Sequence, residues 1–183
     1  MSETNRELKP EDRDNHETLD NKDNSNSSQD EIIESVVIDN IELDDRTRAR
    51  GVALQVLYEM DMSDHPINLI LQERIQSVPL DEQQTKLVLK IVLGLQPYIH
   101  YIDDFIEKYA PEWPIDQIAV IDRNIIRIAV WEFAIGEITP IKVAINESVE
   151  LAKLFGSESS PRFVNGVLGS LADHIKDIQK IKS

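Results

Sequence analysis

The sequence of 183 residues contains no cysteine, and only 5% of it is aromatic. The absence of cysteine excludes disulfides, cysteine-rich zinc sites and a cysteine nucleophile. The sequence also lacks a Gly-rich phosphate loop, a Gly-x-Ser-x-Gly elbow and a His-Glu-x-x-His pair, which are signatures of common enzyme classes. No run approaches 18 apolar residues and the N-terminus has no apolar signal segment, so we expect a cytoplasmic protein without a membrane partner.

Titratable side chains do not gather into a recognisable catalytic or metal site. The four histidines lie one to a region, without the spacing of metal ligands: His16, His65, His100 and His174. Asp103 and Asp104 are adjacent in a predicted helix and point about 100° apart, so we expect a solvated face there rather than a carboxylate pair. Glu132 falls on the apolar side of a predicted helix, either as a catalytic acid or, more commonly, in a structural pair with an arginine or a helix-end amide. We therefore predict no enzyme activity, no metal and no cofactor.

Negative charge is concentrated at the N-terminus. Residues 1–45 carry 15 acidic and 4 basic side chains, whereas residues 46–183 carry 19 acidic and 15 basic ones. The first 30 residues have too few large apolar side chains to form a core and are predicted to be disordered. The apolar segment that follows, EIIESVVIDNIEL, is either a linker, a short helix or a docking segment. We predict a disordered acidic extension over residues 1–44 and one domain over residues 45–183, which can still present a basic face.

The domain is predicted to be all-α, with about seven helices. Apolar residues recur at helical spacing over residues 44–63, 66–76, 81–110, 118–136, 139–156 and 161–179. Pro97 is expected to kink or divide the third of these segments. The fourth segment is apolar almost all the way round, which predicts a helix surrounded by others.

The first predicted helix begins with the segment RTRAR, which contains Arg46, Arg48 and Arg50. Positive charge is unfavourable at a helix N-terminus because of the helix macrodipole, so another interaction must favour these arginines. One explanation is salt bridges with Asp44 and Asp45. The other is phosphate binding, because the planar guanidinium suits phosphate oxygens.

The last predicted helix begins within the segment SSPRFVNGVLG, residues 159–169. Serine is expected to supply an N-cap oxygen, and proline suits the first helical turn. On a helical wheel Arg162 points nearly opposite the apolar stripe, and Phe163 lies about 90° from its centre. Phe163 therefore either covers the edge of the core or offers its ring to an unpaired base, with Arg162 and Lys153 close enough to hold the RNA backbone.

Three segments together resemble the NusB family in their order and approximate spacing. They are RTRARGVALQVLYEMD, IDRNIIRIAVWEF and ITPIKVAINESVELAKLFGSESSPRFVNGVLG, and the resemblance covers roughly residues 46–175. It implies a compact all-helical RNA-binding protein of bacterial transcription antitermination, without catalytic activity. The family binds boxA RNA of ribosomal RNA leader transcripts together with NusE, a ribosomal small-subunit protein, in the RNA polymerase antitermination complex with other Nus factors.

The resemblance also implies roles for individual residues. Those expected to contact RNA are Arg46, Arg48, Arg50, Ser159, Arg162, Phe163 and Asn165. Those expected on the NusE-facing side are Tyr58, Asp116 and Asp122. Gly51 departs from the family pattern, which commonly has a larger, acidic residue there, and predicts a frayed start of the first helix.

Two further hypotheses come from other classes of protein. A NusB-like domain also occurs at the front of certain RNA cytosine methyltransferases, but their chemistry needs a cysteine nucleophile and a cofactor-binding domain. The net charge of −15 keeps open a second alternative, a helical interaction scaffold with weak or no RNA binding. The acidic extension is interpreted either as a solubilising tail or as an internal competitor of RNA that mimics phosphate.

Overall fold

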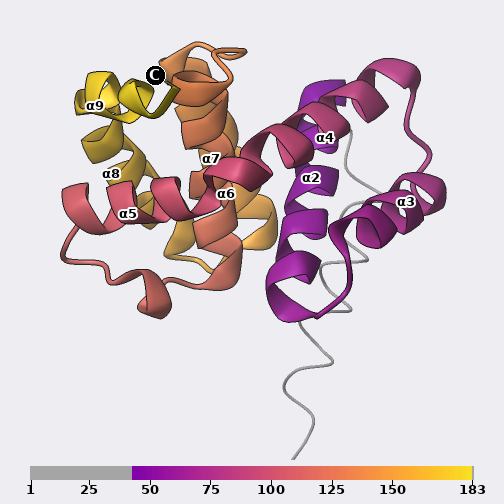
Figure 1. The fold of residues 1–183 in the computed structure, drawn as a ribbon, viewed down its shortest axis with the longest axis horizontal. Helices are drawn as coiled ribbons and strands as arrows, with labels where there is room; N and C mark the ends of the chain where they lie inside the picture. Colours follow the sequence, from indigo (N-terminus) through magenta and orange to yellow (C-terminus); the bar gives the residue numbers. More distant parts are fainter. Residues whose placement is uncertain (1–42, 183) are drawn as a thin grey trace, which may run out of the picture.

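Helices build the described part of the chain, residues 43–182, in the computed structural model (Figure 1). The longer helices are α2 (Asp45–Met62), α3 (Ile67–Ser77), α4 (Glu82–Leu95), α5 (Ile99–Tyr109), α6 (Val120–Val130), α7 (Ile141–Phe155) and α8 (Ser160–Asp173), and the short α9 (Ile175–Gln179) follows. No strand occurs among these residues, which confirms the all-α prediction. The predicted acidic extension lies outside the described residues, except for its last two.

Two groups of helices lie on either side of a central pair (Figure 1). The first group is α2, α3 and α4, and the second is α5, α8 and α9, with α6 and α7 between them. Helix α6 contacts α2, α7 and α8, and from Asn124 to Val130 every residue of it is buried. This confirms the prediction of a helix surrounded by others.

Two helix boundaries test the predictions from proline and from periodicity. The long third segment is divided as Pro97 predicts, because the 3₁₀ turn η1 (Gln96–Tyr98) separates α4 from α5. The prediction of one continuous last helix is wrong, since the backbone at His174 leaves the helical region (φ −111°, ψ 19°) and separates α8 from α9. The His174 ring stacks on Tyr109 with 4.1 Å between ring centroids, a tertiary contact that periodicity does not reveal.

Helix α2 runs without a break through Gly51, so the predicted fraying is wrong. Gly51 is buried, and a Cβ atom there would lie 3.3 Å from Phe155 Cζ. The glycine therefore lets Phe155, the last residue of α7, lie against the first turns of α2. The gain in packing offsets the lower helix propensity of glycine.

A π-helical turn, η3 (Trp131–Ile135), continues α6 at its C-terminal end. The N–H of Gly136 donates to Trp131 O at 2.7 Å, which closes the wide turn. The Trp131 indole packs against Gly94 of α4 and Gly136, where a Cβ atom would overlap it. Such turns re-aim side chains within a helix, and here Glu132 is directed toward α2.

None of the helices within residues 43–182 is long and apolar enough to cross a membrane.

Candidate nucleic-acid interface

Asp44 caps the first turn of α2 and does not form a salt bridge with the arginines of that turn. The Asp44 side chain accepts hydrogen bonds from the backbone N–H groups of Arg46 at 2.9 Å and Thr47 at 3.1 Å. A further hydrogen bond from the Thr47 hydroxyl, at 2.5 Å, is the main reason that the pKa of Asp44 lies below its ordinary value. Asp45 accepts instead from Gln84 of α4 at 2.9 Å. Both carboxylates are thus engaged in holding the helix start, and the salt-bridge explanation of the arginines loses its proposed partners.

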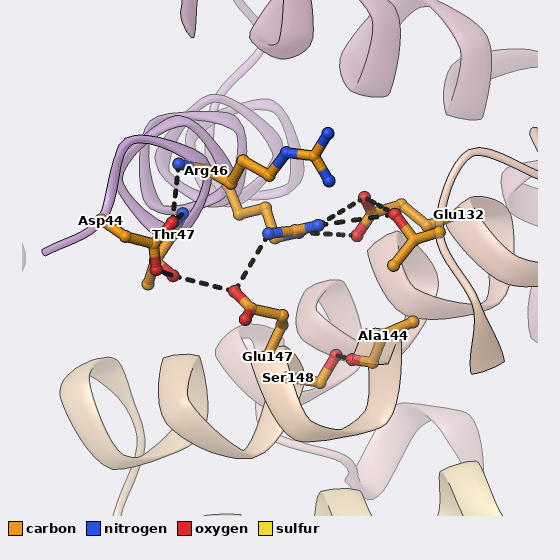
Figure 2. Close-up of polar contacts among 9 residues, drawn as sticks. Asp44, Arg46, Thr47, Glu132, Ala144, Glu147 and Ser148 are labelled. Carbon is orange, nitrogen blue, oxygen red and sulfur yellow. Dashed lines mark hydrogen bonds and ion pairs between the residues drawn. The ribbon is translucent and has the colours of Figure 1, made fainter. Parts of the chain in front are cut away.

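Arg50 is an interior residue, with 2% of its surface exposed. Its Nε and Nη2 atoms donate to the two carboxylate oxygens of Glu132 at 2.8 and 3.0 Å, and its Nη1 donates to Glu147 of α7 at 3.0 Å. Figure 2 shows Glu147 between Thr47 and this buried group. Burial opposes the charge of the guanidinium, but the hydrogen bond and charge of Glu132 raise the pKa of Arg50 above its ordinary value.

This geometry decides between the hypotheses for two residues. Glu132 is the partner of an arginine, as the commoner structural interpretation predicts. The expectation that Arg50 contacts RNA is corrected, because its guanidinium is enclosed and bound to two carboxylates.

Arg46 and Arg48 differ from Arg50 in exposure. Arg46 is exposed, and Figure 2 shows its side chain leading away from Asp44. It lines a hollow of about 290 Å³ together with Lys90 of α4, and the carboxylates of Asp45 and Glu132 line the same hollow. Arg48 is half-buried, and its Nε is buried without a hydrogen-bond partner within residues 43–182. Of the three arginines, Arg46 is the one whose charge is freely accessible.

Asp103 does not lie on a solvated face, which corrects that prediction. It accepts two hydrogen bonds from the buried Arg127, at 2.8 and 2.6 Å. Arg127 also donates to Asp61 at 2.7 Å, and Asp61 accepts from Arg123 at 3.0 Å. These charges join α2, α5 and α6, which leaves Asp103 a structural residue.

The start of α8 is held by Ser160, which is buried. The N–H of Ser157 donates to Ser160 Oγ at 2.9 Å, and the same hydroxyl donates to Asp122 Oδ2 of α6 at 2.9 Å. The predicted N-cap function of serine is wrong, since Ser159, at the cap position, makes no side-chain cap hydrogen bond. A Cβ atom at Gly156 would lie 2.5 Å from that of Ser160, so this tight turn requires glycine.

Phe163 packs against Trp113, a residue that the sequence did not single out. Their ring centroids are 5.0 Å apart and their planes meet at 74°. Trp113 is 47% exposed, whereas Phe163 is half-buried. The two rings line a hollow of about 300 Å³, which we call the Trp113 pocket, between the α5–α6 connection and the start of α8. Phe163 therefore contributes to packing and to an accessible aromatic surface at once.

The remaining residues predicted to contact RNA lie around the same helix start. Ser159, Arg162 and Asn165 are exposed, and Ser159 and Arg162 line a shallow neighbouring hollow. Lys153, near the end of α7, is exposed and pairs with Glu150 at 2.7 Å. Since α7 also carries Glu147 and Phe155, which contact α2, this helix connects the two predicted RNA-contacting regions.

The three residues predicted on the NusE-facing side differ in accessibility. Asp116 is exposed in the 3₁₀ turn η2 (Ile115–Gln117), and Tyr58 is half-buried in α2. Asp122 is only 6% exposed, so little of its side chain is presented to a partner, and its place on the NusE-facing side stays a prediction. Burial raises the pKa of Asp122, and the hydrogen bond from Ser160 offsets this only in part. Within residues 43–182 no three His, Asp or Glu side chains are arranged to hold a metal ion.

Comparison with known proteins covers almost all of this helical part. Residues 47–173 match the model of the NusB family. The transcription antitermination protein NusB of Chloroflexus aggregans is 44% identical over 128 residues, which are 69% of this chain and 85% of the relative.

Solved structures agree with this match. The T. maritima NusB structure is 30% identical with a TM-score of 0.62, covering 74% of this chain and 90% of that chain. A crystal structure of the antitermination factors NusB and NusE in complex with dsRNA is 26% identical with a TM-score of 0.63, covering 75% of this chain and 97% of that chain.

Proposed function

Because the chain belongs to the NusB family, we propose that it is a transcription antitermination factor that binds boxA RNA of ribosomal RNA leader transcripts together with NusE. In this proposal it acts in the cytoplasm, within the RNA polymerase complex that contains other Nus factors. Residues 45–183 form the binding domain, and the acidic extension is separate from it. The similar crystal structure, in which NusB and NusE are in complex with dsRNA, supports the choice of both partners.

The observation that carries the proposal is the aromatic and cationic surface at the start of α8. Aromatic rings stack on unpaired bases with little regard to sequence, and the exposed Trp113 and the half-buried Phe163 supply two rings here. Arg162 is exposed beside them and suits a phosphate oxygen. The side chain of Asn165 is exposed one turn from Arg162, where it either reads a base edge or bonds to a local backbone group.

A second region predicted to contact RNA lies at the start of α2. Arg46 and Lys90 face one hollow there, and they position an RNA backbone without reading its sequence. Arg50 acts indirectly, because its bonds to Glu132 and Glu147 fix the helix that carries Arg46. Arginines thus position the backbone at one region, while the aromatic pair holds a base at the other.

NusE is expected to strengthen RNA binding considerably. The chain is acidic overall, with a net charge of −15, so RNA phosphates meet an unfavourable long-range field. A basic partner bound alongside enlarges the positive surface. We therefore expect weak RNA binding by the chain alone and at least about tenfold tighter binding with NusE, a gain of about 1.4 kcal/mol.

A gel-shift titration tests the proposal, using boxA RNA and a scrambled RNA, each with and without NusE. Tighter binding of boxA RNA than of the scrambled RNA, with a difference that grows when NusE is added, supports the proposal. Unchanged affinity on adding NusE contradicts the role of that partner. No binding of either RNA, while NusE still binds, leaves the interaction scaffold as the function.

The variant Phe163→Ala tests the stacking surface itself. Loss of one base-stacking ring is expected to weaken boxA binding about tenfold, because stacking contributes about 1–3 kcal/mol per base. The melting temperature is measured in parallel. A fall of several degrees with unchanged RNA affinity would show that Phe163 serves packing alone.

A further inference from the structure

The Trp113 pocket combines apolar walls with several polar groups, of which Asp122 is the acidic one. Trp113, Phe163, Pro114 and Ile118 supply the apolar lining. Gln117, Ser157, Ser159 and Asp122 supply the polar lining, and Asp122 lies at the start of α6. A hollow of about 300 Å³ with apolar walls and a few polar groups is typical of a site for a small planar ligand, and an unpaired base is such a ligand.

One of the two oxygens of the Asp122 carboxylate has no hydrogen-bond partner among the described residues. Its Oδ2 accepts the hydrogen bond from Ser160, whereas its Oδ1 is buried without a hydrogen-bond partner among the described residues 43–182. An unpaired buried acceptor is costly, and native proteins satisfy nearly all of them. Since Asp122 lines the pocket, a small rotation of its side chain would bring this buried oxygen to a donor on a bound ligand.

Resting on the proposed RNA-binding function, we propose that the Trp113 pocket holds one unpaired base with an exocyclic amino group, which donates to Asp122 Oδ1, and rejects uracil. Cytosine, adenine and guanine each carry such an amino group, and carboxylates are known acceptors for the cytosine N4 amino group. Uracil presents carbonyl oxygens on both sides of its single ring N–H, and a carboxylate repels them. Asp122 thus adds sequence preference to a surface whose stacking is indifferent to sequence.

The first experiment uses the full-length wild-type chain and two unstructured RNAs, a 12-nucleotide oligo(C) and an oligo(U), at low salt. Both are pyrimidines, so their size and stacking are similar. Oligo(C) is expected to bind about tenfold more tightly, which is the range of discrimination given by one well-formed contact to a base. An oligonucleotide of pyrimidin-2-one, which is cytosine without its amino group, is expected to lose that advantage.

The variant Asp122→Asn turns the acceptor into a donor without changing its shape. The amide oxygen can keep the hydrogen bond from Ser160, and the amide NH₂ group then points into the pocket. We expect the preference to reverse toward oligo(U), whose O4 accepts from this group. Asp104→Asn is the matched control, because it removes the same charge from an exposed position on α5 and should leave the ratio of affinities unchanged.

The outcomes separate this inference from the function on which it rests. Equal binding of oligo(C), oligo(U) and the pyrimidin-2-one RNA, with Phe163→Ala still weakening all three, overturns the inference alone. An unchanged ratio in a folded Asp122→Asn variant overturns it as well. If that variant does not fold, the pyrimidin-2-one comparison on the wild-type chain decides. Absence of binding to any RNA, with NusE also present, overturns the proposed function.

Discussion

Arg46 and Arg50 stand one helical turn apart and have opposite environments. Arg46 is exposed beside Lys90, whereas Arg50 is enclosed between Glu132 and Glu147. A buried guanidinium is tolerated only when its charge and its N–H groups are matched, and here two carboxylates do so. The same residue type thus serves a surface at one position and the attachment of α2 to the rest of the molecule at the other.

Glu132→Gln tests the attachment. Removing one charge of a buried pair leaves the other incompletely compensated, so the free energy of unfolding should fall by about 3 kcal/mol. Urea denaturation measures it. Glu150→Gln is the matched control, because its pair with Lys153 is exposed and should change stability by no more than about 0.5 kcal/mol. Similar losses in the two variants would show that the buried pair does not hold α2.

Asp122 should lower the stability of the fold as pH rises, whereas most carboxyl groups in proteins raise it. Since its pKa is raised by burial, the folded state disfavours the charged form, and the cost grows as pH rises from the ordinary Asp value of 3.8 through the raised pKa. Asp122→Asn removes the ionisation and so removes that cost.

The expected result is a melting temperature for Asp122→Asn about 2 °C above wild type at pH 7, with the difference vanishing near pH 4. Thermal melts of both proteins across that range measure it. A constant difference at all pH values would contradict the assignment, because it would arise from packing rather than from the charge.

At the scale of elements, the π-helical turn after α6 depends on two glycines. Gly94→Ala places a methyl group where the Trp131 indole lies, and overpacking of a buried site costs about 1–3 kcal/mol. This should exceed the gain of up to about 1 kcal/mol in helix propensity.

Gly169→Ala should have the opposite effect on the free energy of unfolding to Gly94→Ala. Gly169 lies inside α8, and a Cβ atom added there would meet no other atom within 4 Å, so the substitution should stabilise the protein by about 0.5–1 kcal/mol. Chemical denaturation of the two variants should therefore give changes of opposite sign. Stabilisation by Gly94→Ala would show that Trp131 moves aside without cost.

At the scale of the whole molecule, charge is divided between the extension and the domain. Residues 1–45 carry 15 acidic and 4 basic side chains and join the domain at the helix start that bears Arg46. We expect a chain without residues 1–43 to bind boxA RNA several-fold more tightly at low salt, because a tethered anionic segment competes for the same cations. The ratio of the RNA affinities of the two chains should approach one as salt shortens the Debye length to about 3 Å at 1 M.

Fluorescence titrations of both chains at several salt concentrations measure the effect. Equal affinities at low salt would exclude competition and leave the solubilising interpretation of the extension.

Much of the fold could be predicted because it depends on local patterns. Apolar spacing indicated the helices, and Pro97 indicated the division between α4 and α5. The break at His174 was missed because the stacking with Tyr109 depends on contact across the sequence. Gly51 was misjudged for the same reason, since its partner Phe155 lies in another helix.

The part of the candidate site at the start of α8 could be predicted, because the helical wheel indicates which side chains there are exposed. Arg162, Asn165 and the flanking position of Phe163 agree with it. Trp113 and the burial of Asp122 were missed because both depend on the connection between α5 and α6 lying against the start of α8. A tryptophan between two prolines, in APEWPIDQ, was the one local signal of an exposed aromatic residue.

The packing of Trp131 between Gly94 and Gly136 limits how this protein can change over evolution. A larger residue at either glycine collides with the indole, and a smaller residue at position 131 leaves a cavity between them. None of the three positions can therefore vary freely by itself. Substitutions at these positions should appear together in lineages that have lost the tryptophan, so covariation among them would record this contact in sequences whose structures are unknown.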